Sequence, residues 1–200
     1  MVRIVQDETI LTGYLNVRRL KIERDGGIVS TLEVESHGEA VALLPYDAGR
    51  RCALTVRLFR APVFVVSGDA YLEEACAGMI DAGEDAAQAV RREAGEELGL
   101  ECRAPLEPLG RVWSSAGVST ERVSLFLVRY SAAERSGPGG GAVGENEGIT
   151  VVERSLRSLL ADVENARIPD HKLLTLVLGL RLRHPELFDE DVRPWRAIMS

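Results

Sequence analysis

The feature that most constrains this chain is the stretch of residues 78–100, in which acidic and basic residues lie between two glycines. The pattern predicts a turn followed by one amphipathic helix that ends at Gly99, because glycine is the usual residue that closes a helix. With about 100° per residue, Glu93, Glu96 and Glu97 fall on one edge of this helix. We therefore expect three carboxylates close together on its surface.

The other faces of the predicted helix carry small and apolar residues. Four of them form a stripe that is expected to pack on the protein core: Ala87, Val90, Ala94 and Leu98. Ala86 and Ala89 fall below the acids, where small side chains would leave room for a bound anion. Gly95 stands inside the helix, where glycine costs about 1 kcal/mol relative to alanine, and this indicates close packing around it.

Three neighbouring carboxylates repel one another, so in a cleft at least one of them would have to bind a proton. A divalent cation removes this conflict, because Mg²⁺ binds oxygen ligands and favours one or two carboxylates together with substrate phosphates. The alternative is a solvated charged face, which composition alone favours. The spacing of the charged residues distinguishes these two interpretations.

Nine positions of the stretch match the pattern G-x5-E-x7-R-E-U-x-E-E-x-G-U, with U aliphatic, and so the chain resembles Nudix hydrolases. The matching residues are Gly78, Glu84, Arg92, Glu93, Ala94, Glu96, Glu97, Gly99 and Leu100. The seven fixed identities would coincide by chance on the order of 10⁻⁸ times per starting position. The resemblance implies an α/β Nudix fold, with a mixed β-sheet in an α/β/α sandwich and an N-terminal β-hairpin extension.

The resemblance also implies which residues bind metal and which perform catalysis. The implied ligands of Mg²⁺, with Mn²⁺ as an alternative ion, are the Ala77 carbonyl, Glu93, Glu97 and Glu147. Glu145 is the implied general base, and Glu96 is the alternative. Arg92 is grouped with these catalytic residues and is expected to pair with Glu84 at the start of the helix.

Four further residues are expected to bind substrate by the same resemblance: Arg57, Arg60, Glu74 and Glu121. A guanidinium suits a diphosphate because its planar fork matches phosphate oxygens. The alternative for the two arginines is a solvated strand edge.

Residues 136–144 are rich in glycine and predict a flexible loop. This loop precedes Glu145 and Glu147 and leads into an aliphatic strand. It could be an ordinary surface loop. In similar Nudix enzymes, however, such a loop carries a catalytic glutamate and a further metal ligand.

Three segments resemble the GDP-mannose hydrolases in particular: residues 74–81, 139–147 and 168–174. The implied reaction is hydrolysis of a nucleoside diphosphate sugar, of the GDP-mannose or ADP-ribose class, to a nucleoside monophosphate and a sugar phosphate. One alternative is a Nudix hydrolase of coenzyme A, of dinucleoside polyphosphates or of oxidised nucleotides. Another is a sensor that binds nucleotide sugars without cleaving them.

The chain of 200 residues is expected to form one domain, or one domain with an appendage. Residues 1–38 would form an N-terminal strand or hairpin region, with a hairpin over residues 14–35, and residues 39–200 the Nudix domain. The resemblance implies that the N-terminal region packs across a homodimer. The net charge of −7 argues against a nucleic-acid partner.

No apolar run has membrane-spanning length, and the first seven residues are too polar for a signal peptide. The three cysteines are scattered and odd in number, which indicates reduced thiols in the cytoplasm.

Periodicity and turn residues predict the remaining elements. Strands are expected at residues 39–46, 52–59, 110–113, 122–130 and 149–152. A short helix is expected at residues 155–165, and Asp170 is expected to cap a longer one that ends before Pro185. Residues 61–70 are expected to be an irregular loop.

Overall fold

The computed structural model describes residues 1–36, 38–141 and 148–188. The chain forms two compact units. The first unit comprises residues 1–40 and 111–123, and the second comprises residues 41–110 and 124–200. The division expected at residues 38 and 39 stays a prediction.

The N-terminal residues form a three-stranded antiparallel sheet in the order β1–β2–β3. Its strands are β1 (Arg3–Thr12), β2 (Asn16–Arg24) and β3 (Ile28–Ser36). The expected hairpin is confirmed by β2 and β3, and Gly26 and Gly27 adopt positive φ angles in the turn between them. β1 was not expected, because its sequence shows no clear alternation of apolar and polar residues. In the structure all of its residues are exposed.

The larger sheet has seven strands, in the order β10–β5–β4–β9–β8, with β6 paired to β5 and β7 paired to β4. Its strands are β4 (Ala40–Asp47), β5 (Cys52–Phe59), β6 (Tyr71–Glu74), β7 (Cys76–Met79), β8 (Leu106–Trp113), β9 (Arg122–Arg129) and β10 (Thr150–Ser155). The helices are α1 (Ala61–Ser67), α2 (Ala86–Leu98), α3 (Leu156–Glu164) and α4 (His171–Arg183), with 3₁₀ turns η1 (Ala132–Glu134) and η2 (Pro185–Leu187).

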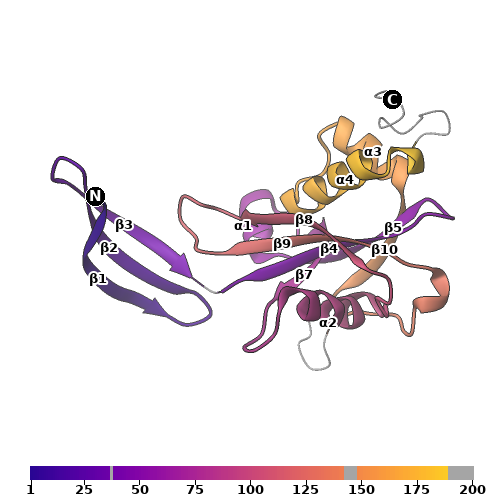
Figure 1. Ribbon diagram of the computed structural model, residues 1–200, viewed down its shortest axis with the longest axis horizontal. Coiled ribbons are helices and arrows are strands. Elements are labelled where there is room, and N and C mark those ends of the chain that lie inside the picture. Colours follow the sequence, from indigo (N-terminus) through magenta and orange to yellow (C-terminus); the bar gives the residue numbers. More distant parts are fainter. Residues whose placement is uncertain (37, 142–147, 189–200) are drawn as a thin grey trace. The chain divides into compact units, whose positions relative to one another are not determined.

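Helices cover both faces of this sheet. In Figure 1, α2 lies on one side of the sheet, and α3 and α4 lie on the other. α4 approaches β8 closely, since a Cβ added at Gly179 would lie 2.4 Å from Cδ1 of Leu109. The expected α/β/α sandwich is therefore confirmed. None of the helices in the described residues has both the length and the apolar character needed to cross a membrane.

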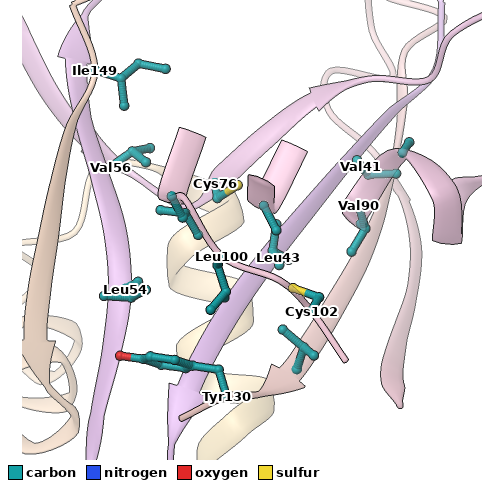
Figure 2. Packing of buried hydrophobic residues seen from close by; sticks show 14 of the residues in the cluster. Val41, Leu43, Leu54, Val56, Cys76, Val90, Leu100, Cys102, Tyr130 and Ile149 are labelled. Atoms are coloured by element: carbon teal, nitrogen blue, oxygen red, sulfur yellow. The ribbon is translucent and has the colours of Figure 1, made fainter. Parts of the chain in front are cut away.

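The hydrophobic core on the α2 side joins the helix to the sheet. Val90, Ala94 and Leu98 of α2 are fully buried with residues of β4 and β5. Figure 2 shows Leu100 and Cys102, from the segment that follows α2, together with the strand residues Val41, Leu43, Leu54 and Val56. α2 is thus fixed against the sheet along one face.

One expected loop is a helix. Residues 61–67 form α1, which begins with Pro62 in its first turn and ends at Gly68 in the left-handed conformation. Proline and glycine are signals of helix ends. The apolar run between them shows no helical alternation of apolar and polar residues, because α1 buries none of its residues and so has no face that must be apolar. The expected strand at residues 110–113 is longer and begins at Leu106.

Candidate active site

α2 has strong capping interactions at both ends. The Asp85 carboxylate accepts hydrogen bonds from the amides of Ala87 and Gln88, and the Gln88 side chain accepts one from the Asp85 amide. This reciprocal pair is a capping box, which stabilises the first turn. Gly99 closes the helix at φ +60°, as expected.

Two of the three expected carboxylates lie on the buried face of α2. The residues that the helix buries are Ala89, Val90, Glu93, Ala94, Glu97 and Leu98. Glu93 is 9% exposed and Glu97 is 5% exposed. This excludes a solvated charged face as the explanation for these two acids. Glu96 lies at the rim, with its side chain 35% exposed.

Three expectations about the small residues of α2 are wrong. Ala89 is fully buried and Ala86 packs against the same core, so these alanines leave no open face for an anion. Ala87 is exposed instead of packed. A Cβ added at Gly95 would meet no atom within 4 Å, so close packing does not explain that glycine.

Arg92 binds several acids of the stretch at once. Its Nε and Nη2 donate to Glu84 at 3.2 and 3.1 Å, and Nη2 also donates to the Met79 carbonyl at 2.8 Å. Its Nη1 donates to Glu93 at 2.7 Å and to Glu96 at 3.0 Å. The expected pair with Glu84 is confirmed.

We call Arg92, the three glutamates that it binds and the neighbouring buried Glu97 the Arg92 cluster: Arg92, Glu84, Glu93, Glu96 and Glu97. The hydrogen bonds from Arg92 lower the pKa of Glu84. The hydrogen bonds to Glu84, Glu93 and Glu96 raise the pKa of Arg92, and the one to Glu84 has the largest effect. Burial acts in the opposite direction and lowers this pKa. The four carboxylates and one guanidinium of the cluster give it a formal excess of three negative charges, and the Asp81 carboxylate, 3.6 Å from Nε of Arg92, adds a further negative charge beside it.

The middle of β7 places main-chain groups directly against the two buried acids. The Ala77 amide donates to Oε2 of Glu97 at 3.1 Å. A Cβ added at Gly78 would lie 1.9 Å from Oε1 of Glu93, so only glycine allows this carboxylate its position. The structure therefore brings Ala77, Glu93 and Glu97 together.

Cys76 lies beneath these acids and is fully buried. Burial raises the pKa of its thiol well above the usual value, and the neighbouring Glu97 and Glu93 carboxylates raise it further. Cys76 therefore remains a neutral thiol, consistent with the expected reduced cysteines, and all three cysteines are free in the structure.

Arg60 and Glu74, which were each expected to bind substrate, bind each other. Nε and Nη2 of Arg60 donate to the two oxygens of Glu74 at 2.6 and 3.0 Å. Glu74 is 3% exposed, so its carboxylate is held inside the protein. Whether either residue contacts a substrate stays a prediction.

Lys172 and Asp170 extend this pair into what we call the Glu74 network (Arg60, Glu74, Asp170 and Lys172). The Lys172 amine donates to Glu74 at 3.2 Å and to Asp170 at 2.9 Å. The other Asp170 oxygen accepts from the amides of Ala75 and Leu173. Burial disfavours the charged amine, but the two carboxylates raise the pKa of Lys172.

Arg57 lies on the exposed side of β5 with two aromatic residues. Its guanidinium carbon is 5.1 Å from the centroid of the Tyr71 ring, close enough for a cation–π contact. Tyr71 meets Phe59 edge-on, with ring centroids 6.5 Å apart. Arg57 thus remains accessible to an anion, beside an aromatic pair that sequence reasoning did not identify.

Comparison with known proteins agrees with this geometry. A family model described as NUDIX domain matches residues 36–162, which is more than half of the chain. The chain belongs to the Nudix family.

Its relatives cover nearly its whole length. The GDP-mannose pyrophosphatase of Cronobacter sakazakii is 32% identical over 187 residues, which cover 91% of this chain and 96% of that protein. The GDP-mannose pyrophosphatase of Escherichia coli O1:K1 is 28% identical over 188 residues, covering 92% and 96%. A solved structure of an ADP compounds hydrolase has the same fold, with a TM-score of 0.72 at 18% identity, and covers 90% and 92%. The chain is therefore a Nudix pyrophosphohydrolase.

Three further Nudix site residues were expected: Glu121, Glu145 and Glu147. Glu121 belongs to the first unit, where its amide donates to the Ser119 hydroxyl at 3.0 Å. Glu145 and Glu147 lie outside the described residues. Their roles, like those of all the expected site residues, stay predictions.

Nudix hydrolases generally need a divalent metal. No group of three or more His, Cys, Asp or Glu side chains in residues 1–36, 38–141 and 148–188 is arranged to hold one. The buried pair Glu93 and Glu97 nevertheless fits a hard cation, which takes one or two carboxylates and completes its shell with water and phosphate oxygens. The excess negative charge of the Arg92 cluster supports the same conclusion.

Sequence reasoning missed Lys172, although it singled out residues 168–174 as similar to the GDP-mannose hydrolases. The only local signal is the pattern Pro-Asp-x-Lys at the start of α4, which predicts the cap formed by Asp170. The contact with Glu74 depends on tertiary structure, since the two residues are 98 positions apart.

Proposed function

We propose that this Nudix enzyme is a Mg²⁺-dependent hydrolase of GDP-mannose, which it would cleave to GMP and mannose 1-phosphate. The observation that carries the proposal is the buried pair Glu93 and Glu97 in a cluster with excess negative charge. The similarity to two GDP-mannose pyrophosphatases over nine-tenths of the chain supports the substrate.

Glu93, Glu97, the Ala77 carbonyl and Glu147 would hold Mg²⁺, or Mn²⁺ in its place. When bound, the ion would neutralise charge on the diphosphate and lower the pKa of a water molecule at the scissile phosphorus. Arg92 orients Glu93 through the 2.7 Å hydrogen bond, and Gly78 leaves space for that carboxylate.

Other residues would bind the substrate and move the proton. Arg57 and Arg60 are our candidates for contacts to the diphosphate, with Glu74 keeping Arg60 in position. Glu121 is a further candidate for a substrate contact. Glu145 is the candidate base that accepts the proton of the attacking water, and Glu96 is the alternative.

We further propose that the enzyme is a cytoplasmic homodimer. β1 exposes Ile4, Ile10 and Leu11 in the single chain, and exposed apolar strands are a cause of association between chains. The molar mass of the protein, measured by light scattering during size-exclusion chromatography, tests the dimer directly. A particle with the mass of one 21.8 kDa chain would contradict it.

The experiment that tests the substrate is hydrolysis of GDP-mannose, ADP-ribose, UDP-glucose and NADH side by side in Mg²⁺, with the products identified. We expect GDP-mannose to give the highest kcat/KM, and EDTA to abolish turnover. Preference for ADP-ribose would assign the chain to the neighbouring class. Turnover of none of the four, with binding retained, would support a nucleotide-sugar sensor.

A further inference from the structure

The glycine-rich segment that follows η1 caps the C-terminal end of α2. We call residues 136–141 the glycine clamp. The amides of Gly140 and Gly141 donate to the carbonyls of Glu97 and Glu96 at 2.9 and 3.1 Å. Helix ends leave such carbonyls without intrahelical partners. The clamp therefore supplies the hydrogen bonds that the last turn of α2 lacks.

The clamp touches α2 through the main chain, at a distance that only glycine permits. A Cβ added at Gly139 would lie 2.1 Å from the carbonyl oxygen of Glu97 and 2.8 Å from the carbonyl carbon of Leu98. On the other side, a Cβ at Gly99 would lie 2.4 Å from the carbonyl oxygen of Gly137. Gly139 and Gly99 also have φ angles of +72° and +60°. All of these contacts are with main-chain atoms, so no flexible side chain could move to make room for a larger residue at either position.

These contacts fix Glu97 at both ends. Its carbonyl accepts from Gly140 of the clamp, and its carboxylate accepts from Ala77 in the middle of β7. Glu93 is fixed independently, by Arg92 and by the close approach of Gly78. A movement of the last turn of α2 would therefore change the separation of the Glu93 and Glu97 carboxylates.

We propose that Gly139 is a positioning residue, which sets the position of Glu97 for metal binding by letting the clamp contact the end of α2. The inference rests on the proposed metal role of Glu93 and Glu97. Metal sites require their ligands to be held within about 0.5 Å of the productive geometry. The main-chain contact at Gly139 supplies that restraint on one ligand and not on the other.

The test compares Gly139→Ala with Gly137→Ala. The second variant is a matched control in the same clamp, because a Cβ at Gly137 meets no atom within 4 Å and Gly137 has no positive φ. Mn²⁺ binding is measured by electron paramagnetic resonance without substrate, together with the Mg²⁺ concentration that gives half-maximal hydrolysis. We expect Gly139→Ala to weaken Mn²⁺ binding at least about fivefold, and Gly137→Ala to change it less than about twofold.

Mn²⁺ binding by Gly139→Ala within about twofold of the wild type would overturn the inference. A second measurement keeps the test decisive if Gly139→Ala does not fold. In the wild-type protein, Mg²⁺ should slow amide hydrogen exchange at Gly140 and Gly141, because metal binding and the clamp restrain the same residue. Exchange that Mg²⁺ leaves unchanged would also contradict the inference.

The two proposals can fail separately. If the wild type binds Mn²⁺ tightly but hydrolyses no nucleotide sugar, the proposed substrate is wrong and the role of Gly139 is still testable by binding. If the wild type hydrolyses GDP-mannose but Gly139→Ala binds Mn²⁺ normally, the role of Gly139 is wrong and the proposed function stands.

Discussion

Two groups of charged residues in the second unit each contain two buried carboxylates and differ in charge balance. In the Glu74 network, Glu74 and Asp170 face two cations, Arg60 and Lys172. The Arg92 cluster contains four carboxylates and one guanidinium, and the guanidinium binds three of the carboxylates directly. The first group is neutral as a whole, and the second has an excess of three negative charges.

The difference indicates which group balances the charge of its own buried acids and which requires a metal ion. A balanced, hydrogen-bonded network needs no further ion, and it loses stability when one partner is removed. An unbalanced cluster is costly to bury unless a cation joins it. Burial alone does not separate these cases, because Glu74 is as buried as Glu97.

The largest expected effect is on the unbalanced cluster. Glu97→Gln keeps the shape of the side chain and removes the charge that a divalent ion needs. We expect turnover of GDP-mannose to fall at least about 10³-fold, while the protein still folds. Glu101→Gln is the matched control, because Glu101 is exposed and pairs with Arg103 outside the cluster.

Thermal unfolding with and without Mg²⁺ completes this test. Mg²⁺ should raise the unfolding temperature of the wild type and of Glu101→Gln, because a ligand that binds only the folded state stabilises it. It should have little effect on Glu97→Gln. Full activity in Glu97→Gln would show that the excess charge has no catalytic purpose.

The next effect is on the balanced network. Lys172→Met leaves the buried Glu74 and Asp170 with one cation fewer, and we expect the free energy of unfolding to fall by about 2–3 kcal/mol. The loss should be the same with and without Mg²⁺. Urea denaturation measures it, and Lys21→Met on the exposed side of β2 is the control. A loss that Mg²⁺ restores would contradict the proposed division of roles.

The same variant predicts a pH dependence. The pKa of Lys172 is raised in the folded protein, so its contribution is complete below the unfolded value of about 10.4 and is lost as pH rises through the higher folded value. As pH rises above about 10.4, the wild type should therefore lose more unfolding free energy than Lys172→Met.

The smallest effect distinguishes two glycines beside the Arg92 cluster. Gly95→Ala should stabilise the protein by up to about 1 kcal/mol, because its Cβ meets no atom and alanine favours the helix. Gly78→Ala should instead destabilise the protein, since its Cβ would collide with the Glu93 carboxylate. Chemical denaturation of both variants decides the point, and a destabilised Gly95→Ala would contradict this description of α2.

Local patterns predicted much of the fold and the centre of the site. The bounds of β5 follow from an apolar run after the turn at residues 47–51, and the end of α2 at Gly99 follows from helix capping; both are local effects. The pair of Arg92 and Glu84 was also predicted, because it lies within one short motif.

The failures have a different physical origin. The burial of Ala89 and the open space around Gly95 depend on where the sheet meets α2, which a helical wheel does not contain. The bond between Arg60 and Glu74, and its extension to Lys172, arises from contacts among β6, α4 and the segment after β5. α1 was missed because an exposed apolar helix has no periodic pattern.

The first unit is built from two segments that are far apart in the sequence, and this limits where the chain can be truncated or joined to a related chain. The main chain of Glu35 donates to the Val118 carbonyl at 2.8 Å and accepts from the Thr120 amide at 3.0 Å. A protein shortened to begin at residue 41 would keep residues 111–123 and lose the strand that completes their backbone pairing. Chimeras with related enzymes should therefore exchange residues 1–40 and 111–123 together, as one discontinuous module.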